Sequence, residues 1–385
     1  MNFQFSEEQQ LLADSVKRLI DEQYSFETRK KIIASEQGWS AEVYAKLADL
    51  GLCALAFDES LGGFGAGALD MIPVLQALGR GLLVEPYTST IGVPAYVLAH
   101  HGSSNNHKLV HEVLESVVAG HTRIAWAHDE AKSRWELTAV QSSARQLPNG
   151  RWQLKGEKRQ VLHAAAAQWL LISARNAGTA HDRHGLSLFL VPTDLAGLHL
   201  KTYRTYDDQR AADVSFDIEL DPVSMIGEAG SAIDAIEEAC DWAQALLCAE
   251  ALGVMDEANR LTLEYLKTRK QFGMPIGSFQ SLQHRMVDMM MNAEQSRSMT
   301  YLACDRVDAA RSGKVSAADR SRAVSMARVK VNESARHIGQ EAIQLHGGMG
   351  MTIEMKISHC FKRLTAISQR FGDLDHHLDQ LARAA

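Results

Sequence analysis

The chain has 385 residues, 46% of them hydrophobic, so it can bury a large core and favours two or three domains over one. Lys and Arg number 40 against 47 Asp and Glu, and the formal net charge of -7 gives no support to a nucleic-acid or anionic-membrane partner. The 5 cysteines include no CxxC pair, so we expect reduced thiols in a cytoplasmic protein, without a disulfide framework or zinc site.

The first part of the chain, residues 1–121, has helical spacing throughout. It opens with the amphipathic stretch "MNFQFSEEQQLLADSVKRLIDEQY", in which Ser6 is placed to cap a helix, and not with the basic end and apolar run of a signal peptide. The chain also lacks an apolar run of the roughly 20 residues that a spanning helix requires. We therefore predict an N-terminal helical domain and no membrane insertion.

The hydrophobic period changes twice further along. Residues 122–226 contain four short alternating runs that are typical of strands, "RWQLKGEK", "WLLISAR", "LSLFLVP" and "ADVSFDIEL", with a hairpin-type turn at Pro148-Asn149-Gly150. From 227–385 the helical period returns in segments at about 231–268, 278–312, 316–345 and after 358. The predicted fold class is α+β, with a β-sheet or barrel-like middle domain and a C-terminal four-helix bundle.

A cationic elbow, "RKQFGMPIGSFQ", interrupts the C-terminal helices. Arg269 follows a long predicted helix, where the helix dipole alone favours a cation. Phe272-Gly273 adds an aromatic residue and a backbone that a ligand can approach, and Gln280 opens the next helix with an amide. Because an arginine fork is a usual partner of phosphate, we interpret the elbow as an anion site.

A glycine cluster, "EAIQLHGGMGMT", closes a later helix. It follows a helix and not a strand, so it fails the context test for a Rossmann dinucleotide site. Gly347 and Gly348 have a structural explanation as a helix cap and turn. Gln344 offers donors and acceptors to a flat ligand such as a nucleotide base. Both interpretations stay open from the residues alone.

Together, "RKQFGMPIGSFQSLQHRMVDM", "QLHGGMGMT", "GLCALAFDESLGGFG" and "LKGEK" resemble the acyl-CoA dehydrogenase family of flavoproteins over essentially the whole chain. The resemblance implies FAD bound between subunits, with Arg269 and Phe272 at the pyrophosphate of a flavin lodged mainly in the neighbour. It places Gln280 near the same cofactor, and Gln344, Gly347 and Gly348 near its adenine half.

The resemblance also implies the reaction, which is α,β-dehydrogenation of an acyl-CoA thioester by a carboxylate base and a flavin. The two positions at which the family carries its glutamate are Phe371 and Ala243 here, and Gln244 replaces a substrate-contacting arginine. Asp373 is the candidate base that remains near the first position. Glu250, about two helical turns beyond the second position, is interpreted as a structural or supporting group.

The β domain departs from the family as well, because Gln160 stands where a tryptophan faces the flavin ring. The tail "KRLTAISQRFGDLDHHL" resembles the small subunit of bacterial pimeloyl-CoA dehydrogenase. This implies an acyl-CoA substrate of medium length or with a second carboxylate, a large dehydrogenase-like partner in a homo- or hetero-tetramer, and an electron-transfer acceptor. The alternatives are a catalytically silent subunit that completes a partner's flavin site, and a flavin monooxygenase or nitroalkane-oxidase-like relative.

Some charged residues have no assigned role in this scheme. The histidine pairs His376–His377 and His181–His184 lack a converging third ligand, so we expect solvated side chains and no metal site. Arg363 fits either a surface cation or a contact to a CoA phosphate.

Overall fold

The computed structural model describes residues 5–102 and 107–383, so the ends of the predicted ranges at 1–4 and 384–385, and the stretch 103–106, lie outside the described residues. The chain divides into two compact units, which are described separately. A helical unit combines Met1–Lys31, Gly67–Leu83 and Gln244–Ala385, and a β unit combines Ile32–Ala66 and Val84–Ala243. Within the described ranges, no helix is both long and apolar enough to cross a membrane.

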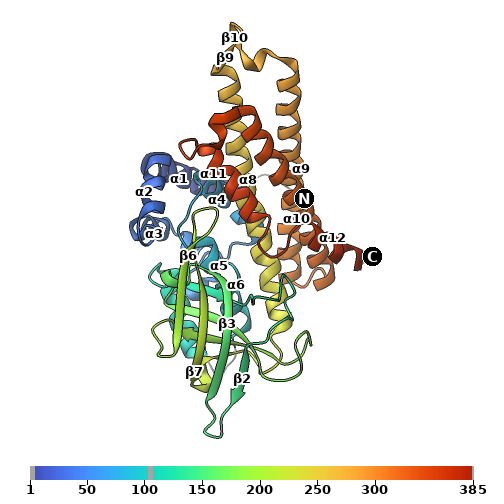
Figure 1. The fold of residues 1–385 in the computed structure, drawn as a ribbon. Coiled ribbons are helices and arrows are strands. Elements are labelled where there is room, and N and C mark those ends of the chain that lie inside the picture. Colours follow the sequence, from blue (N-terminus) through green and yellow to red (C-terminus); the bar gives the residue numbers. More distant parts are fainter. Residues whose placement is uncertain (1–4, 103–106, 384–385) are drawn as a thin grey trace. The chain divides into compact units, whose positions relative to one another are not determined.

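The helical unit is built on long antiparallel helices that run side by side (Figure 1). Its elements are α1 (Glu7–Gln23), α4 (Ala68–Gly81), β9 (Lys270–Gln271), β10 (Met274–Pro275), η5 (Ile276–Ser278), α9 (Gln280–Arg311), α10 (Ala317–His346), η6 (Gly347–Met351), α11 (Lys356–Ile367) and α12 (Leu374–Arg383). The unit boundaries fall inside α2 (Phe26–Ala34) and α8 (Ile233–Thr268).

Side-chain caps define where these helices begin. The Ser6 hydroxyl oxygen accepts a hydrogen bond from the Gln9 backbone N–H at 3.2 Å, and the Gln9 side-chain oxygen accepts one from the Ser6 backbone N–H at 2.8 Å. This capping box confirms the predicted start of α1. Ser316 caps α10 with its side chain alone, which accepts a hydrogen bond from the Asp319 backbone N–H at 3.0 Å.

One helix is capped from outside its own segment. Gly67, before α4, has no side chain that could accept a bond from the first amides of the helix. The carboxylate of Asp308, on α9, accepts from the amides of Ala68 at 2.8 Å and Leu69 at 3.0 Å. A Cβ at Gly67 would lie 2.5 Å from that carboxylate, so the glycine allows the close approach. Asp308 therefore joins α9 to the start of α4 and complements its dipole.

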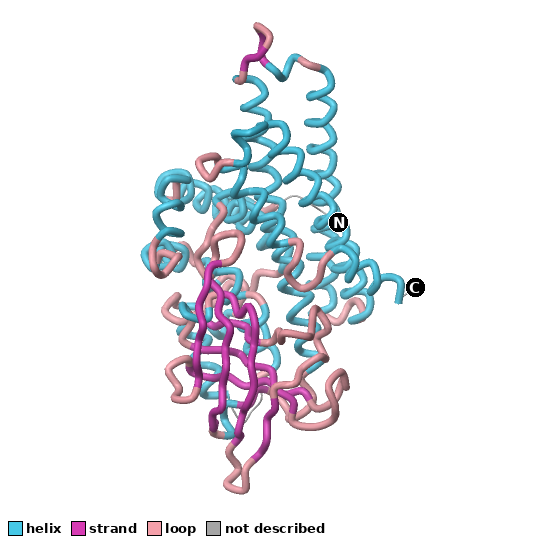
Figure 2. Tube along the Cα trace, in the orientation of Figure 1, coloured by secondary structure: helices cyan, strands magenta, loops and turns pink. Residues whose placement is uncertain are grey.

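The β unit contains most of the strands, which Figure 2 shows gathered into one body. Its elements are α3 (Ala41–Asp49), η1 (Leu52–Ala54), η2 (Glu59–Leu61), α5 (Tyr87–Ile91), α6 (Val93–His101), α7 (His107–Val118), β1 (Ile124–Ala127), β2 (Ser143–Gln146), β3 (Trp152–Leu162), η3 (Ala164–Ala166), β4 (Trp169–Arg175), β5 (Leu186–Pro192), β6 (Leu198–Arg204), β7 (Arg210–Leu220), η4 (Pro222–Ser224) and β8 (Met225–Ile226).

In the described part of the unit, 8 strands form one sheet in the order β6-β7-β3-β2-β4-β5-β8, with β1 beside β4. Most neighbours are antiparallel, whereas β1 and β2 pair with β4 in parallel, β2 at the single position Ser143↔Arg175. The core of the sheet holds residues such as Leu154, Leu170 and Phe189, all buried.

The predicted fold class is confirmed by this architecture. The four strands expected from alternation correspond to β3, β4, β5 and β7, and the predicted turn joins β2 to β3 through a 2.8 Å bond from Leu147 N–H to Arg151 C=O. The sequence did not indicate β2 and β6, because both are largely exposed and carry polar residues on both faces. All 5 cysteines are free and buried, as expected.

The cap on α4 leads to a stability prediction. Asp308→Ala leaves two helix amides without their acceptor and should lower the free energy of unfolding by about 1–2 kcal/mol. Asp308→Asn keeps an acceptor and should lose less. Urea denaturation measures both, with Asp305→Ala on the same helix as the control. Equal stability of Asp308→Ala and the control would show that the cap contributes nothing.

Candidate functional site

The elbow after α8 is a tight hairpin. Arg269 follows the last residue of α8; its N–H donates to Tyr265 C=O and its C=O accepts from Ile276 N–H, both at 2.8 Å. Phe272 and Gly273, with φ of +53° and +81°, form the two-residue turn between β9 and β10. Positive φ at both positions is the pattern of a type I′ turn, and it is costly for phenylalanine.

The side chains of this hairpin point into solvent. Phe272 is 90% exposed, and its ring contacts the Phe279 ring edge-on at a centroid distance of 6.1 Å. Arg269 and Gln280, the first residue of α9, are exposed as well. Among the described residues, no carboxylate forms an ion pair with Arg269. An uncompensated guanidinium beside an exposed, strained aromatic residue suits an anionic ligand with a flat part.

The second glycine cluster forms the end of α10. Gly347 caps the helix with a φ of +61°, and its amide donates to Gln344 C=O. A Cβ at Gly347 or Gly348 would meet no atom within 4 Å, so the bare backbone faces open space. Gln344 and both glycines are exposed. The structural role of Gly347 is therefore established, and room for a ligand is present beside it.

A ring stack brings the two predicted clusters together. His346 ends α10 immediately before Gly347, and its imidazole stacks on Tyr265, one turn before Arg269, with centroids 4.4 Å apart and planes 25° from parallel. The exposed arginine and the exposed glycine backbone thus belong to adjoining helix ends. This pair was not predicted from the sequence, although a histidine next to an apolar residue at the end of a helix was a visible signal.

Asp373 has a structural role in the turn between α11 and α12. Its carboxylate accepts a 2.9 Å hydrogen bond from the His376 amide, which is the geometry of an N-cap at the start of α12. The neighbouring Phe371 is partly buried and has a φ of +58°. The role of Asp373 as a base stays a prediction, and the cap accounts for its presence without chemistry.

A buried arginine holds this turn. Arg328 on α10 is fully buried and donates to the carbonyls of Ile367 at 3.0 Å, Arg370 at 2.7 Å and Gly372 at 3.3 Å. Three carbonyls at the end of α11 thereby take the place of a carboxylate partner. The backbone of Phe371 lies between two of these anchored residues, which explains how its unfavourable conformation is maintained.

Arg363 is not a surface cation, contrary to one of the two predicted interpretations. Its side chain is buried, donates to Glu250 at 2.8 Å and reaches Leu83 C=O at 2.6 Å. A buried guanidinium needs such partners, because an isolated charge is costly to desolvate. Glu250 therefore has a structural role as the ion-pair partner of Arg363.

The prediction of solvated histidines is wrong for His377, which is 1% exposed. Burial and the adjacent Arg328 guanidinium, 3.5 Å away, lower the pKa of His377 to about 2. His181 is exposed, as predicted. Within the described ranges, no three His, Cys, Asp or Glu side chains come together as metal ligands.

In the β unit, Gln160 lies on a β-bulge of β3, with a φ of +52° and an exposed side chain. Nearby, the fully buried Lys158 donates to Glu130 at 2.8 Å, to Ser173 Oγ at 3.1 Å and to His128 C=O at 3.0 Å. Burial, with Lys158 close by, lowers the pKa of His128 to about 3. This cluster supports the sheet, whereas the bulge offers an amide and no aromatic ring.

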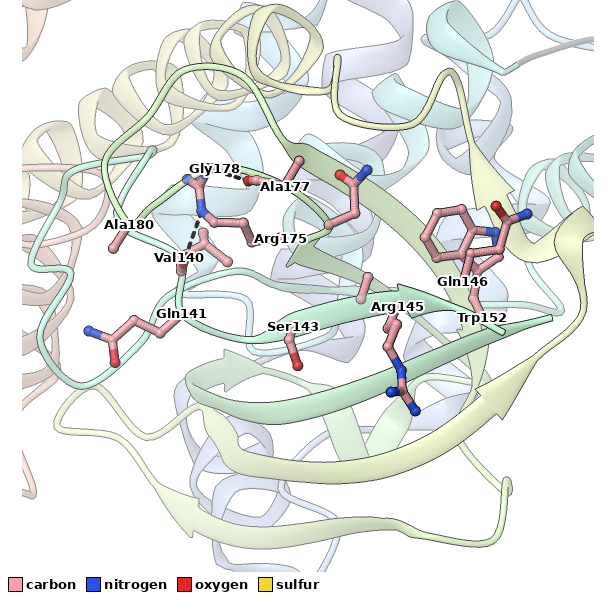
Figure 3. A pocket seen from close by; sticks show the side chains of 12 residues that line it. Val140, Gln141, Ser143, Arg145, Gln146, Trp152, Arg175, Ala177, Gly178 and Ala180 are labelled. Atoms are coloured by element: carbon pink, nitrogen blue, oxygen red, sulfur yellow. Dashed lines mark hydrogen bonds between the residues drawn. The ribbon is translucent and has the colours of Figure 1, made fainter. Parts of the chain in front are cut away.

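A hollow of about 710 Å³ in the β unit opens beside β2 and β4 (Figure 3). Arg175 lines it, but its guanidinium donates to the carbonyls of Val140, Thr138, Asp182 and His184. The lining includes none of the residues predicted to bind cofactor. The hollow is thus separate from the predicted site.

Comparison with known proteins gives one consistent family. Models described as the N-terminal, middle and C-terminal domains of acyl-CoA dehydrogenase match residues 6–135, 125–218 and 230–385. An L-prolyl-[peptidyl-carrier protein] dehydrogenase of Serratia sp. is 29% identical, over 92% of this chain and 90% of its own. A solved FAD complex of PigA is 27% identical, with a TM-score of 0.89 over 100% of this chain and 98% of the other. The Tcur3481-Tcur3483 steroid ACAD is similar at 27% identity, with a TM-score of 0.85 over 98% and 97%.

We expect the buried histidines His377 and His128 to make the protein less stable in acid. The folded protein keeps His377, with a pKa of about 2, and His128, with a pKa of about 3, neutral, whereas the unfolded chain protonates them near pH 6.5. The contribution of each histidine to the free energy of unfolding is therefore fully present above about pH 6.5. It falls as the pH drops below that value, by at most about 1.4 kcal/mol per pH unit. Urea unfolding between pH 7.5 and pH 5 should show a shallower slope for His377→Asn than for wild type, while His181→Asn should keep the wild-type slope.

Proposed function

The chain belongs to the acyl-CoA dehydrogenase family, and from this premise we propose that it is the small subunit of a heteromeric enzyme that oxidises a medium-length or dicarboxylic acyl-CoA. Members of this family are flavin-dependent oxidoreductases that dehydrogenate acyl-CoA or similar thioesters. The chemistry that FAD would supply, when bound, is hydride acceptance during oxidation of the thioester. The contribution of this chain is to hold the cofactor and to complete the site.

The exposure of the cofactor arm is the observation that supports this proposal. We define the arm as Arg269, Phe272, Gln280, Gln344, Gly347 and Gly348, all exposed in the single chain. A flavin dinucleotide held only by these residues would lie in water. Phosphate contacts gain strength when solvent is excluded, so the arm makes physical sense when a second polypeptide covers the ligand.

The residues of the arm fit the chemistry of FAD. Arg269 supplies an uncompensated guanidinium for the pyrophosphate, and the open backbone of Gly347 and Gly348 allows close approach. Phe272 offers an aromatic face, while the amides of Gln280 and Gln344 can pair with polar edges of the ligand.

The missing carboxylates favour a small-subunit role. Ala243 is a methyl group on α8 at one of the family's base positions, and Phe371 is a hydrocarbon ring at the other. Gln160 replaces the ring-facing tryptophan in the β unit. A chain with an intact arm but without a base and a ring seat suits an assembly in which the partner supplies both.

Exposed apolar side chains provide a surface for such a partner. On α9, Val287, Met290 and Met291 are 51%, 51% and 49% exposed, and their spacing puts them on one helix face. Met351 beside the glycine turn is 74% exposed. Apolar residues grouped in this way are typical of protein interfaces, and methionine adapts to an irregular partner surface.

A thioester on a peptidyl carrier is a second candidate substrate, favoured by the similarity to the L-prolyl carrier-protein dehydrogenase. A catalytically silent subunit is the alternative outcome for the chain's own role. Expression alone and with a large dehydrogenase-like partner, followed by flavin absorbance and the flavin-to-chain ratio, tests whether the chain needs a partner to form an active flavin site. Flavin bleached by acyl-CoA only in the co-expressed assembly supports the proposal. A lone chain that holds flavin stoichiometrically and is bleached contradicts it.

Removing the guanidinium should weaken flavin retention. Arg269→Ala deletes a charge-assisted phosphate contact, which contributes about 1.5–3 kcal/mol, so the FAD dissociation constant should rise roughly tenfold or more. Fluorescence titration of the flavin-free assembly measures the constant. Lys267→Ala, another exposed cation of the same helix end, is the matched control. Equal constants for Arg269→Ala and wild type would remove the arm from the flavin site.

Asp373→Asn tests the candidate base without disturbing the cap, because asparagine caps helices as well as aspartate does. If Asp373 is the base, the variant keeps its flavin and its stability but no longer bleaches with acyl-CoA. If Asp373 serves only as the cap, bleaching continues at the wild-type rate, while Asp373→Ala loses stability by about 1 kcal/mol. Stopped-flow absorbance of the bound flavin and urea unfolding distinguish the two outcomes.

A further inference from the structure

We propose that the stacked pair Tyr265 and His346 is a positioning device that holds the elbow and the glycine turn together as one FAD-binding arm. This inference rests on the proposed function and extends it to two residues outside the arm defined above. Tyr265 is fixed to the elbow and His346 to the glycine turn, so that each ring is connected to one half of the arm.

Tyr265 is connected to the elbow through its backbone. Its carbonyl accepts the Arg269 amide at 2.8 Å, the bond that closes the last turn before the elbow, and Arg269 C=O is in turn fixed by Ile276. The 3-10 helix η5 packs on the same turn, since a Cβ at Gly277 would lie 2.9 Å from Leu266 C=O. Displacement of Tyr265 therefore shifts the backbone that carries Arg269.

His346 is connected to the glycine turn in the same manner. It is 3% exposed, and its Nδ1 donates to Ala342 C=O at 2.8 Å, which sets the tautomer and the ring orientation. Gly350 folds back on it, because a Cβ there would lie 2.9 Å from the His346 Cβ. Burial lowers the pKa of His346, so the ring is neutral and stacks as an uncharged aromatic group.

The stack is thus a direct side-chain link between two segments that lie far apart in the sequence. Neither ring is part of the exposed arm, so neither needs to contact the ligand. The ligand-binding groups themselves come from flexible or bare positions, namely a long arginine side chain and two glycines. Binding by such groups is strong only when their backbones are held in place beforehand.

The test compares variants that remove the stack from either side. Tyr265→Leu and His346→Leu should each raise the FAD dissociation constant of the assembly about 2-fold to 10-fold, the range expected for one aromatic pair. Tyr265→Phe keeps a ring and should bind FAD as wild type does. His346→Phe loses the bond to Ala342 but keeps a ring, and should recover most of the affinity lost in His346→Leu. Tyr301→Leu, which removes a tyrosine that contacts Phe5 at 5.8 Å in the same unit, is the matched control.

A second measurement needs no flavin. Amide hydrogen exchange of the full chain should become faster at residues 269–277 in His346→Leu and at 347–351 in Tyr265→Leu, each across the stack from the substitution. If His346→Leu fails to fold, the reciprocal Tyr265→Leu still reports the coupling.

The outcomes separate the two proposals. Unchanged FAD binding in Arg269→Ala overturns the proposed function, and exchange across the stack then decides whether the link itself exists. The positioning role alone is overturned by a combination of two results. Arg269→Ala weakens FAD binding, but Tyr265→Leu and His346→Leu behave like the control Tyr301→Leu in both measurements.

Discussion

An arginine that has no acid partner in the described structure is the feature on which the cofactor arm depends. By contrast, three buried guanidinium groups elsewhere in the described chain have partners within the protein: Arg363 pairs with Glu250, while Arg328 and Arg175 donate to clustered backbone carbonyls. Arg269 is exposed at the end of α8 and makes no such contact among the described residues. Its charge is therefore available to a ligand, and the fold around it fixes the backbone without engaging the side chain.

The contrast between Asp308 and Asp373 shows how one residue type can mislead a sequence argument. Both carboxylates accept backbone amides at the start of a helix, Asp308 from α9 onto α4 and Asp373 at its own helix, α12. Only the second lies close to the position where the family carries a base. The presence of Asp373 near the family's base position is thus explained by its cap on α12. Whether Asp373 also acts as a base requires an independent test.

Local rules predicted much of the fold. The cap at Ser6, the turn at Pro148-Asn149-Gly150 and the long helices followed from residues adjacent in sequence. The errors concern long-range partners. Arg363 and His377 are of residue types that usually lie on the surface. Both are buried here against partners that are distant in sequence, Glu250 for Arg363 and Arg328 for His377. Neither periodicity nor charge patterning contains that information.

Contacts between distant residues are also the reason why the sequence indicated the elbow and the glycine turn only as two separate motifs. The elbow and the glycine turn each have a purely structural explanation, a helix-end cation in one case and a helix cap in the other, and the structure shows that the cap at Gly347 is real. Their meaning changes once Tyr265 and His346 place the two helix ends in contact. Each exposed group then has a neighbour of complementary chemistry. A cation, two bare glycines and an aromatic residue together suit a dinucleotide, whereas no single motif among them would be sufficient to bind one.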